Sequence, residues 1–374
     1  MSLRHSSLHA EHIELGARLV DFGGWEMPLS YPEGTIAEHL ACRNDAAVFD
    51  VSHLGTVRVG GPGSFELLQT SLTNDLHRIG PGRAQYQHLL DEADASVLDD
   101  LIVWWVGEDR FDVMPNASNT ARVISVLGGH DVTHERAVIA VQGPRARQRL
   151  AAVSPDAAAV GHFAVADFEF GGTPCRVAGT GYTGEDGVEC AVPSEMAAAF
   201  WRAVIGAGVK PAGLGARDTL RLESGLPLHG HELGAGITPL QAGLGWVVSW
   251  DKGPFRGREA LDRERTAGPW RRLRGLLAEG RRPPRNDDAV LVDGQVSGVV
   301  TSGNYSPVLQ CGIALAFLPP GTAMGVNVEI ALRGGRAPAV VVKPPFQRLR
   351  VAASENDGDS VRVAGSGTTE GTGS

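Results

Sequence analysis

The chain has 374 residues, which is more than one ordinary domain needs, so two or three domains are expected. Its 43 % hydrophobic and 21 % charged residues are typical of a globular enzyme, and its net charge of −9 disfavours a general nucleic-acid binder. It has no apolar run of membrane-span length, no signal-peptide core at its start and no C-x-x-C motif among its four cysteines. We therefore expect a cytoplasmic protein without nucleic-acid or membrane partners.

The first part of the chain is expected to alternate helices and strands. Residues 35–49 have helical periodicity, with Thr35 as the N-cap and Glu38 completing a capping box. A hairpin is expected to turn around the segment D-E-A-D-A-S. The predicted elements are, in chain order, helix 35–49, strand 49–61, helix 64–72, hairpin strands 85–90 and 97–106, strand 111–116 and helix 119–127.

A second α+β unit is expected from Ala137 onward, followed by an all-β domain. Ser194 is expected to cap one of its helices. Short β-rich segments separated by glycine and proline predict a small all-β domain or barrel over 290–342, and the polar residues 351–374 are predicted to be disordered. The elements before the barrel are strand 137–141, a helix from Pro144 to 153, hairpin 167–178, strand 187–192 and helices 195–205 and 213–225.

Two adjacent aspartates, Asp99 and Asp100, lie inside the apolar run 97–106. Carboxylates are costly there unless they are paired, hydrogen-bonded or used. Side chains alternate along a strand, so the two should face apart and not form a carboxylate dyad. The alternative to a functional role is that an aspartate near a strand start bonds nearby backbone amides.

A glycine-rich segment at 179–184, G-T-G-Y-T-G, matches the dinucleotide-binding pattern G-x-G-x-x-G. It leads into another predicted strand, however, so no helix N-terminus is available for a pyrophosphate. These glycines would instead let the backbone lie against a flat ligand. The residues left to contact such a ligand are Tyr182, Glu185, Asp186 and Glu189.

The histidines do not predict a metal site. His229 and His231 form a close pair, and His5, His9 and His12 have helical spacing. No H-E-x-x-H motif occurs, and no set of carboxylates or cysteines completes a zinc shell in the sequence. We therefore expect no bound metal.

Two further patterns have competing interpretations. Ser52 and His53 follow an aspartate, but there is no G-x-S-x-G elbow, so a serine hydrolase is disfavoured. Arg217 and Arg221 are one helical turn apart and could together bind a carboxylate ligand. The alternative is a surface pair neutralised by its acidic helix neighbours, Asp218 and Glu223.

A series of segments, taken together, resembles the aminomethyltransferase family, the T-protein of the glycine cleavage system. They stand in the family order from about Leu8 to Arg350. The matching segments are F-D-V-S-H-L (49–54), A-Q-Y (84–86), V-L-D-D-L-I-V (97–103), A-V-I-A-V-Q-G-P (137–144), G-Y-T-G-E-D-G-V-E (181–189), G-A-R-D-T-L-R-L-E-S-G-L-P-L-H-G (215–230), T-P-L-Q-A-G-L-G-W-V-V (238–248), V-T-S-G-N-Y-S-P-V-L (300–309) and K-P-P-F (343–346).

One departure from the family pattern precedes Val97. Ala95 and Ser96 stand where the family usually has Gly-Gly. Glycine permits positive φ and alanine is poor at it, so we expect a turn of a different type. The segment W-D-K-G-P-F-R-G-R-E (250–259) lacks the cysteine of the related iron–sulfur assembly branch, which disfavours that branch.

The resemblance implies an α+β, three-domain T-protein fold around a central folate site. Residues 1–265 would form the folate-binding region as two interleaved α+β subdomains. One subdomain would join 1–50 with 137–240, and the other would join 51–136 with 241–265. Residues 266–350 would form a C-terminal β-barrel.

The resemblance also implies a tetrahydrofolate-dependent aminomethyltransferase of the glycine cleavage system. Such an enzyme takes an aminomethyl group from the lipoyl arm of a carrier, the H-protein, delivers the methylene to folate and releases ammonia. The alternatives are a folate-dependent demethylase of a small sulfonium, methyl ether or methylamine, and a silent folate-binding module.

The resemblance assigns roles to five residues. Asp100 matches the family's critical aspartate, and Glu189 and Arg217 match substrate-contacting positions. Asn116 and Tyr182 match other positions of the folate pocket. Glu189 would receive the ring N–H groups of the pterin, and Arg217 would suit the glutamate carboxylate of folate. A carboxylate such as Asp100 can orient an amine and accept or redirect its proton.

Overall fold

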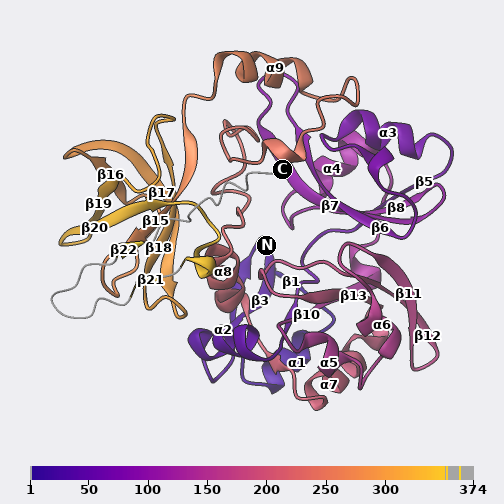
Figure 1. The fold of residues 1–374 in the computed structure, drawn as a ribbon. Helices are drawn as coiled ribbons and strands as arrows, with labels where there is room; N and C mark the ends of the chain where they lie inside the picture. The colour runs from indigo at the N-terminus through magenta and orange to yellow at the C-terminus, as the bar shows by residue number, and fades with distance from the viewer. Residues whose placement is uncertain (1, 350, 353–361, 364–374) are drawn as a thin grey trace, which may run out of the picture. The chain divides into compact units, whose positions relative to one another are not determined.

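The computed structural model describes residues 2–349, 351–352 and 362–363, and the chain forms two compact units (Figure 1). One unit comprises Met1–Arg221 with Pro227–Arg272, and the other comprises Leu222–Leu226 with Leu273–Ser374. None of the described helices is long and apolar enough to cross a membrane. The tail predicted to be disordered lies outside the described residues, apart from β21 (Val351–Ala352) and β22 (Arg362–Val363), which pair antiparallel.

A six-stranded sheet forms one core of the first unit. Its strand order is β11 (Val165–Phe170), β12 (Thr173–Ala178), β13 (Gly187–Pro193), β10 (Arg136–Gln142), β4 (Ala47–Asp50) and β14 (Lys210–Pro211). Alternate residues of β10 face opposite layers. Ile139 and Val141 pack with helices α5 (Ala146–Leu150), α6 (Pro155–Ala159) and α7 (Ala197–Gly206), whereas Val138 and Ala140 pack with α2 (Thr35–Asn44) and α8 (Leu214–Glu223).

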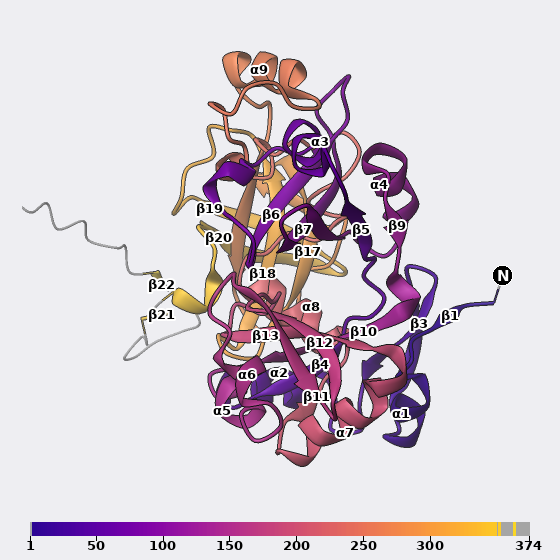
Figure 2. The same cartoon turned by 90° about the vertical axis from the view of Figure 1, so that its right-hand side faces the viewer.

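A five-stranded sheet lies against the α2 and α8 side of the first. Its order is β6 (Arg83–Leu90), β7 (Val97–Gly107), β8 (Arg110–Met114), β5 (Val57–Gly60) and β9 (His130–Asp131). Helices α3 (Ser64–Ser71) and α4 (Thr120–Leu127) bury Leu68 and Val123 on one face, and α4 lies beside β5 and β9 (Figure 2). The other face contributes Ala84 and Trp104 to the layer shared with the six-stranded sheet.

A small sheet and several short elements complete the first unit. The strand order of this sheet is β1 (Arg4–His5), β3 (Trp25–Ser30) and β2 (Arg18–Phe22), with β1 parallel to β3. The remaining helices are α1 (His9–Glu14), α9 (Arg258–Ala267) and the 3-10 turns η1 (Leu76–Arg78), η2 (Thr133–Glu135), η3 (Ser194–Met196) and η4 (Gly245–Val247). The predicted residue bounds of the two interleaved subdomains remain a prediction.

The second unit is a closed six-stranded barrel, as predicted. Its order is β15 (Arg272–Ala278), β18 (Cys311–Leu318), β17 (Gln295–Ser306), β16 (Ala289–Val292), β19 (Asn327–Leu332) and β20 (Gly335–Val342), and η5 (Phe346–Arg348) follows. Leu276, Ala316 and Ile330 belong to its buried core. Bulges in β16 and β17 increase the local twist that a closed barrel requires.

Most predicted elements form near their predicted positions, but the region after Thr35 differs. Helix α2 ends at Asn44, and the last residues of the predicted helix form β4, because Ala47–Asp50 pairs with β10 inside the core. The predicted strand 49–61 is divided between β4 and β5, which belong to different sheets. Tertiary pairing overrides the local helical pattern here.

Both predicted helix caps are wrong. Gly34 occupies the N-cap position of α2. The Glu38 carboxylate accepts the backbone N–H groups of Tyr31 and Gly213. The hydroxyl of Ser194 donates to the His134 carbonyl at 2.8 Å, and α7 begins only at Ala197. The side chains of Glu38 and Ser194 therefore bond backbone groups outside the helix ends that they were expected to cap.

The β6–β7 hairpin turns through a left-handed residue. Ala95 has φ of +60° and is fully buried, so this alanine adopts the positive φ that usually favours glycine. The Asp94 carboxylate accepts the Ser96 N–H at 2.8 Å, and Asp91 and Ser96 pair through their backbone at 2.8 Å. These contacts, and burial of the Ala95 methyl group among Leu90 and Val97, offset the cost of positive φ.

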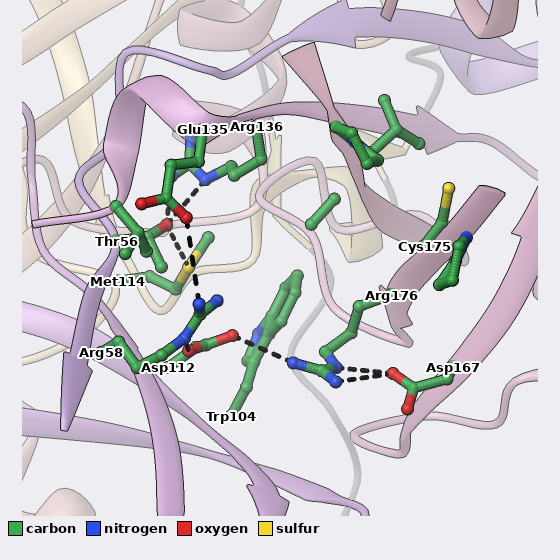
Figure 3. A pocket seen from close by; sticks show the side chains of 15 residues that line it. Thr56, Arg58, Trp104, Asp112, Met114, Glu135, Arg136, Asp167, Cys175 and Arg176 are labelled. Carbon is green, nitrogen blue, oxygen red and sulfur yellow. Dashed lines mark hydrogen bonds and ion pairs between the residues drawn. The ribbon is translucent and has the colours of Figure 1, made fainter. Parts of the chain in front are cut away.

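A ladder of alternating charges joins the two large sheets (Figure 3). The Asp112 carboxylate on β8 lies 2.9 Å from Arg58 Nε and 3.2 Å from Arg176 Nη1 on β12. Asp167 and Glu135 extend the ladder at its two ends. It borders a cavity of about 290 Å³ between the sheets, and none of the predicted site residues is among the described residues that line it.

A buried histidine–aspartate contact anchors the start of the chain to the six-stranded sheet. His12 Nε2 lies 2.9 Å from Asp50 Oδ2, which also accepts the Ser6 hydroxyl at 2.6 Å. Burial alone would raise the pKa of Asp50, but hydrogen bonds and the charge of His12 lower it to about 2. Asp50 thus pairs with His12 and not with the neighbouring His53.

Replacing Asp50 should strongly destabilise the first unit. Asp50→Asn removes a buried carboxylate that bonds Ser6, His12 and the Ser52 N–H, and each hydrogen bond to a charged group typically contributes about 1.5–3 kcal/mol. The native pKa lies below the ordinary value of 3.8, so this stabilisation is present above that value and is lost as pH falls toward 2. Urea unfolding of both proteins at pH 7 and at pH 3 measures it.

The matched control is Asp167→Asn, which removes a carboxylate that is 67 % exposed and 2.7 Å from Arg176. Exposed pairs contribute about 1 kcal/mol or less, so its unfolding midpoint should stay close to that of the parent. Equal shifts for the two variants would show that the Asp50 pair has no special role.

Candidate functional site

The two adjacent aspartates lie beside a β-bulge in strand β7. Leu89 pairs with Asp99 and Leu90 pairs with Val97, so Leu98 is an extra residue opposite β6. A bulge of this kind bends the strand and re-aims the neighbouring side chains. His88 stands directly opposite Asp100, and Tyr86 is two residues further along the same strand.

Asp99 is fully buried and held by asparagine donors. Its Oδ1 accepts Nδ2 of Asn116 and Nδ2 of Asn119, each at 2.8 Å, and its Oδ2 accepts the Asn116 backbone N–H at 3.1 Å. These bonds reach the segment after β8 and not only backbone amides near the start of its own strand. Asp99 fixes the position of Asn116.

Asn116 in turn connects the two aspartates. Its Nδ2 lies 2.8 Å from Asp99 Oδ1, 2.9 Å from Asp100 Oδ1 and 3.0 Å from the Asp100 carbonyl oxygen. Strict alternation would have kept the carboxylates apart, but at the bulge they share one donor. The two groups therefore titrate as a pair rather than independently.

Asp100 also bonds the hydroxyl of Tyr86, which can either donate a hydrogen bond to the carboxyl group or accept one from it. The Tyr86 hydroxyl lies 2.8 Å from Asp100 Oδ2, and His88 Nε2 lies 3.4 Å from the same hydroxyl. Burial lowers the pKa of His88 to about 3, so its imidazole is neutral at physiological pH. A protonated Asp100 can donate to Tyr86 while Tyr86 donates to His88, and an ionised Asp100 can accept from Tyr86.

Burial and mutual repulsion hold a proton on the carboxyl pair. Burial, followed by the charge of Asp100, raises the pKa of Asp99 to about 8. Burial likewise raises the pKa of Asp100, although Tyr86, His229 and Asn116 oppose the rise. The Asp99 oxygens already accept three N–H groups, so the shared proton fits better on Asp100.

Three more predicted site residues form a second group. Glu189 lies on β13 and accepts the Thr180 hydroxyl at 2.5 Å. The Arg217 guanidinium, on α8, lies over the Tyr182 ring with its Cζ 4.8 Å from the ring centroid. The Tyr182 hydroxyl donates to the Pro227 carbonyl. An acceptor, a cation and an aromatic face are thus brought together.

Arg217 retains an unused donor. Its Nη1 is buried and has no hydrogen-bond partner among the described residues. Burial lowers the pKa of Arg217, while the charges of Glu189 and Tyr182 oppose this. Arg221, by contrast, is 2 % exposed and bonds Asp218 and Glu232, so it is not the surface residue of the alternative interpretation.

The two groups meet at Tyr182. Burial raises the pKa of Tyr182, and the charge of Asp100 adds to this rise. Burial also raises the pKa of Tyr86, with further contributions from Asp100 and Tyr182. The predicted residues Asp100, Asn116, Tyr182, Glu189 and Arg217 therefore all face one region of the first unit.

The glycine-rich loop before Glu189 serves the protein's own packing. A Cβ on Gly179 would lie 1.9 Å from the Gly161 carbonyl oxygen, and one on Gly181 would lie 1.9 Å from Gln142 Oε1. These two glycines therefore allow close packing within the protein, and contact of the loop with a ligand stays a prediction. The two acidic residues of this loop, Glu185 and Asp186, pair with Arg43 and Arg147, each at 2.7 Å.

Two further residues belong to the site and were not predicted. Trp246, on η4, is 66 % exposed and stacks on Tyr86 with ring centroids 6.0 Å apart. His229 Nε2 lies 3.1 Å from the Leu98 carbonyl at the bulge, and its charge lowers the pKa of Asp100. The available signals were Gly243 and Gly245, which precede Trp246, and the position of His229 after the α8 segment.

Comparison with known proteins covers almost the whole chain. A family model described as the GCVT N-terminal domain matches residues 8–252, and one described as the glycine cleavage T-protein C-terminal barrel domain matches residues 271–347. Both matches follow the order of the sheets and the barrel described above.

Curated relatives and a solved structure agree with these matches. The chain is 47 % identical over 362 residues to an aminomethyltransferase of Mycobacterium tuberculosis, covering 93 % of this chain and 98 % of that protein. It is 46 % identical to one of a Parafrankia species, covering 92 % and 98 %. The crystal structure of glycine cleavage system aminomethyltransferase T from Bartonella henselae superposes with a TM-score of 0.84 at 35 % identity, covering 92 % of this chain and 98 % of that chain. The chain therefore belongs to the glycine cleavage T-protein family of aminomethyltransferases.

Proposed function

We propose that this protein transfers the methylene of an aminomethyl-lipoyl group to tetrahydrofolate and releases ammonia. The observation that carries the proposal is the joint presence, in one region, of a carboxyl group hydrogen-bonded to a tyrosine and a cation whose buried donor is unused. These are Asp100, bonded to Tyr86, and Arg217, beside Tyr182 and near the charge of Glu189. Folate dependence is general in this family.

The second group matches the edge of a reduced pterin. A pterin presents ring N–H groups beside a carbonyl oxygen, which need an acceptor and a donor side by side. Glu189 offers a carboxylate, and Arg217 offers the unused Nη1 donor. Since the charge of Glu189 acts on Arg217, both belong to one end of the ligand. We therefore assign Arg217 to the pterin carbonyl rather than to the distant glutamate carboxylate of folate.

Asp100 is suited to move the protons of the reaction. Two folate nitrogens bond to the methylene carbon, and the carbon–sulfur and carbon–nitrogen bonds of the donor break. Of the two protons that leave the folate nitrogens, one ends on the lipoyl sulfur and one on ammonia. A carboxyl whose pKa is raised by burial can accept a proton from an amine and return it to a leaving group.

We further propose that the donor reaches the site on the lipoyl arm of the H-protein. A carrier-bound aminomethyl group is the donor that an aminomethyltransferase requires, and the closest competing reading, a demethylase, would use a small methylated molecule instead.

One assay distinguishes a carrier-bound donor from a small methylated donor. The purified chain is incubated with tetrahydrofolate and either aminomethyl-lipoyl carrier or a set of sulfonium, methyl ether and methylamine compounds. Ammonia release that depends on carrier and folate supports the proposal. Methyl-folate formation from a small donor, without ammonia release from the carrier, contradicts it.

Asp100→Asn should keep folate binding and lose most turnover. A positioned acid–base group typically contributes about 100–10,000-fold to rate. The neutral amide can still accept from Asn116 and bond Tyr86, so the surrounding structure should persist. Ammonia release and folate titration measure the two effects. Asp109→Asn, an exposed position in the turn after β7, is the control; equal turnover in both variants would rule out the proton-transfer role.

Tyr86→Phe should move the acidic limb of the activity–pH profile to higher pH. The Tyr86 hydroxyl bonds the ionised form of Asp100 and lowers its pKa, against the rise caused by burial. Without it the pKa of Asp100 rises further, so the ionised base is lost at a higher pH, by about one unit. The pH dependence of kcat measures this. Tyr305→Phe, in the barrel strand β17, should leave the limb in place.

Arg217→Ala should weaken folate binding by about 10–100-fold, which is the effect of losing a hydrogen bond to a charged group. Equilibrium titration with tetrahydrofolate measures the Kd. Arg263→Ala removes an exposed arginine from helix α9 and should leave the Kd unchanged. An unchanged Kd in Arg217→Ala would remove this residue from the binding site.

A further inference from the structure

A three-residue cluster lies near the start of the chain. It is remote in sequence from Asp100 and Arg217 and belongs to the small β1–β3–β2 sheet. His5 lies on β1, His9 is the first residue of α1, and Glu26 lies on β3. The parallel pairing of β1 with β3 places His5 directly beside Glu26. The helix that follows brings His9 to the same carboxylate. The spacing of the histidines in the sequence did not indicate an acidic partner. The pairing of β1 with β3 brings Glu26 to them.

The distances in this cluster do not suit hydrogen bonds. Glu26 Oε2 lies 3.3 Å from His5 Nε2 and 3.5 Å from His9 Nε2. Charge-assisted N–H···O bonds are normally about 2.7–2.9 Å long. Ligand atoms held at about 2.0–2.1 Å around one tetrahedral metal ion lie about 3.3–3.4 Å from each other. The observed separations therefore match atoms that share an ion better than atoms that share a proton.

We propose that His5, His9 and Glu26 bind one divalent transition-metal ion through the two Nε2 atoms and a Glu26 oxygen, with zinc as the first candidate. All three ligand atoms lie within 4.8 Å of one another. Two imidazoles and one carboxylate are a recognised zinc ligand set that leaves the fourth position to water. Imidazole also suits copper and nickel, whereas magnesium prefers oxygen ligands only.

The cluster is accessible and its histidines are ready to bind. The side chains of His5, His9 and Glu26 are 53 %, 19 % and 34 % exposed. The two rings stack with centroids 3.8 Å apart and planes 3° from parallel, so they must rotate about χ2 for both planes to contain the ion. That torsion is soft.

The ion would tie three separate elements together. β1 is only two residues long and pairs only with β3 among the described strands. A metal bridging β1, α1 and β3 would hold this short strand in place, in addition to the hydrogen bond that the Arg4 guanidinium Nη2 donates to the Gly23 carbonyl. An ion that binds only the folded chain stabilises the folded state by mass action. The role we assign is structural and independent of the proposed aminomethyl transfer.

The test uses the full chain after dialysis against a chelator. Calorimetric titration with zinc chloride should give one site that is lost, or weakened by about tenfold or more, in His9→Ala and in Glu26→Gln. Cobalt(II) should give the intense visible absorption of a tetrahedral site in the parent only. His130→Ala removes an exposed histidine from β9 and should change neither result. Magnesium chloride should give no binding signal.

Circular dichroism of each variant checks that it is folded, so a loss of binding reports the site. The proposal is overturned if the parent binds no zinc, or if His9→Ala and Glu26→Gln bind it with the parent's stoichiometry and affinity. The second result would mean only scattered binding to surface histidines.

Discussion

Burial of two adjacent carboxylates is the constraint that shapes the first unit. Asp99 and Asp100 lose hydration and repel each other, so each needs donors that the chain must bring to it. Asn116 supplies the decisive contact, since its amide reaches both carboxylates at 2.8 and 2.9 Å. The bulge at Leu98, the end of β8 and the start of α4 all serve that contact. The local arrangement of three elements thus follows from one amide group.

The site that results is electrically polar. At one end the aspartates and Tyr86 present acceptors and a movable proton, and at the other Arg217 presents an unused donor. Tyr182 belongs to both ends, because it stacks under Arg217 and responds to the charge of Asp100. A ligand that fits must offer an amine at one end and a carbonyl at the other. This polarity, rather than the size of an opening, is the basis of our proposal that the site binds a reduced pterin.

Elements with a strong local pattern were predictable from the sequence. The β6–β7 hairpin, α3 and the barrel form close to their predicted positions, whereas the roles of Asp100 and Arg217, which the family resemblance implies, stay predictions. The failures share a different cause. β4 forms inside a predicted helix because β10 pairs with it, and the bulge joins two carboxylates that strict alternation separates. Trp246 and Glu26 gain their roles from partners that are remote in sequence. No local pattern contains such information.

The charge ladder through Arg58, Asp112 and Arg176 affects how the contact between the two large sheets responds to rising temperature. The cost of removing water from charged groups falls as temperature rises, while hydrophobic stabilisation levels off. The ladder crosses between the two large sheets, whose shared layer otherwise depends on apolar contacts such as those of Trp104 and Ala84. On warming, a growing share of the cohesion between these sheets therefore comes from ions. The two large sheets should therefore separate at a higher temperature than their apolar contacts alone would allow.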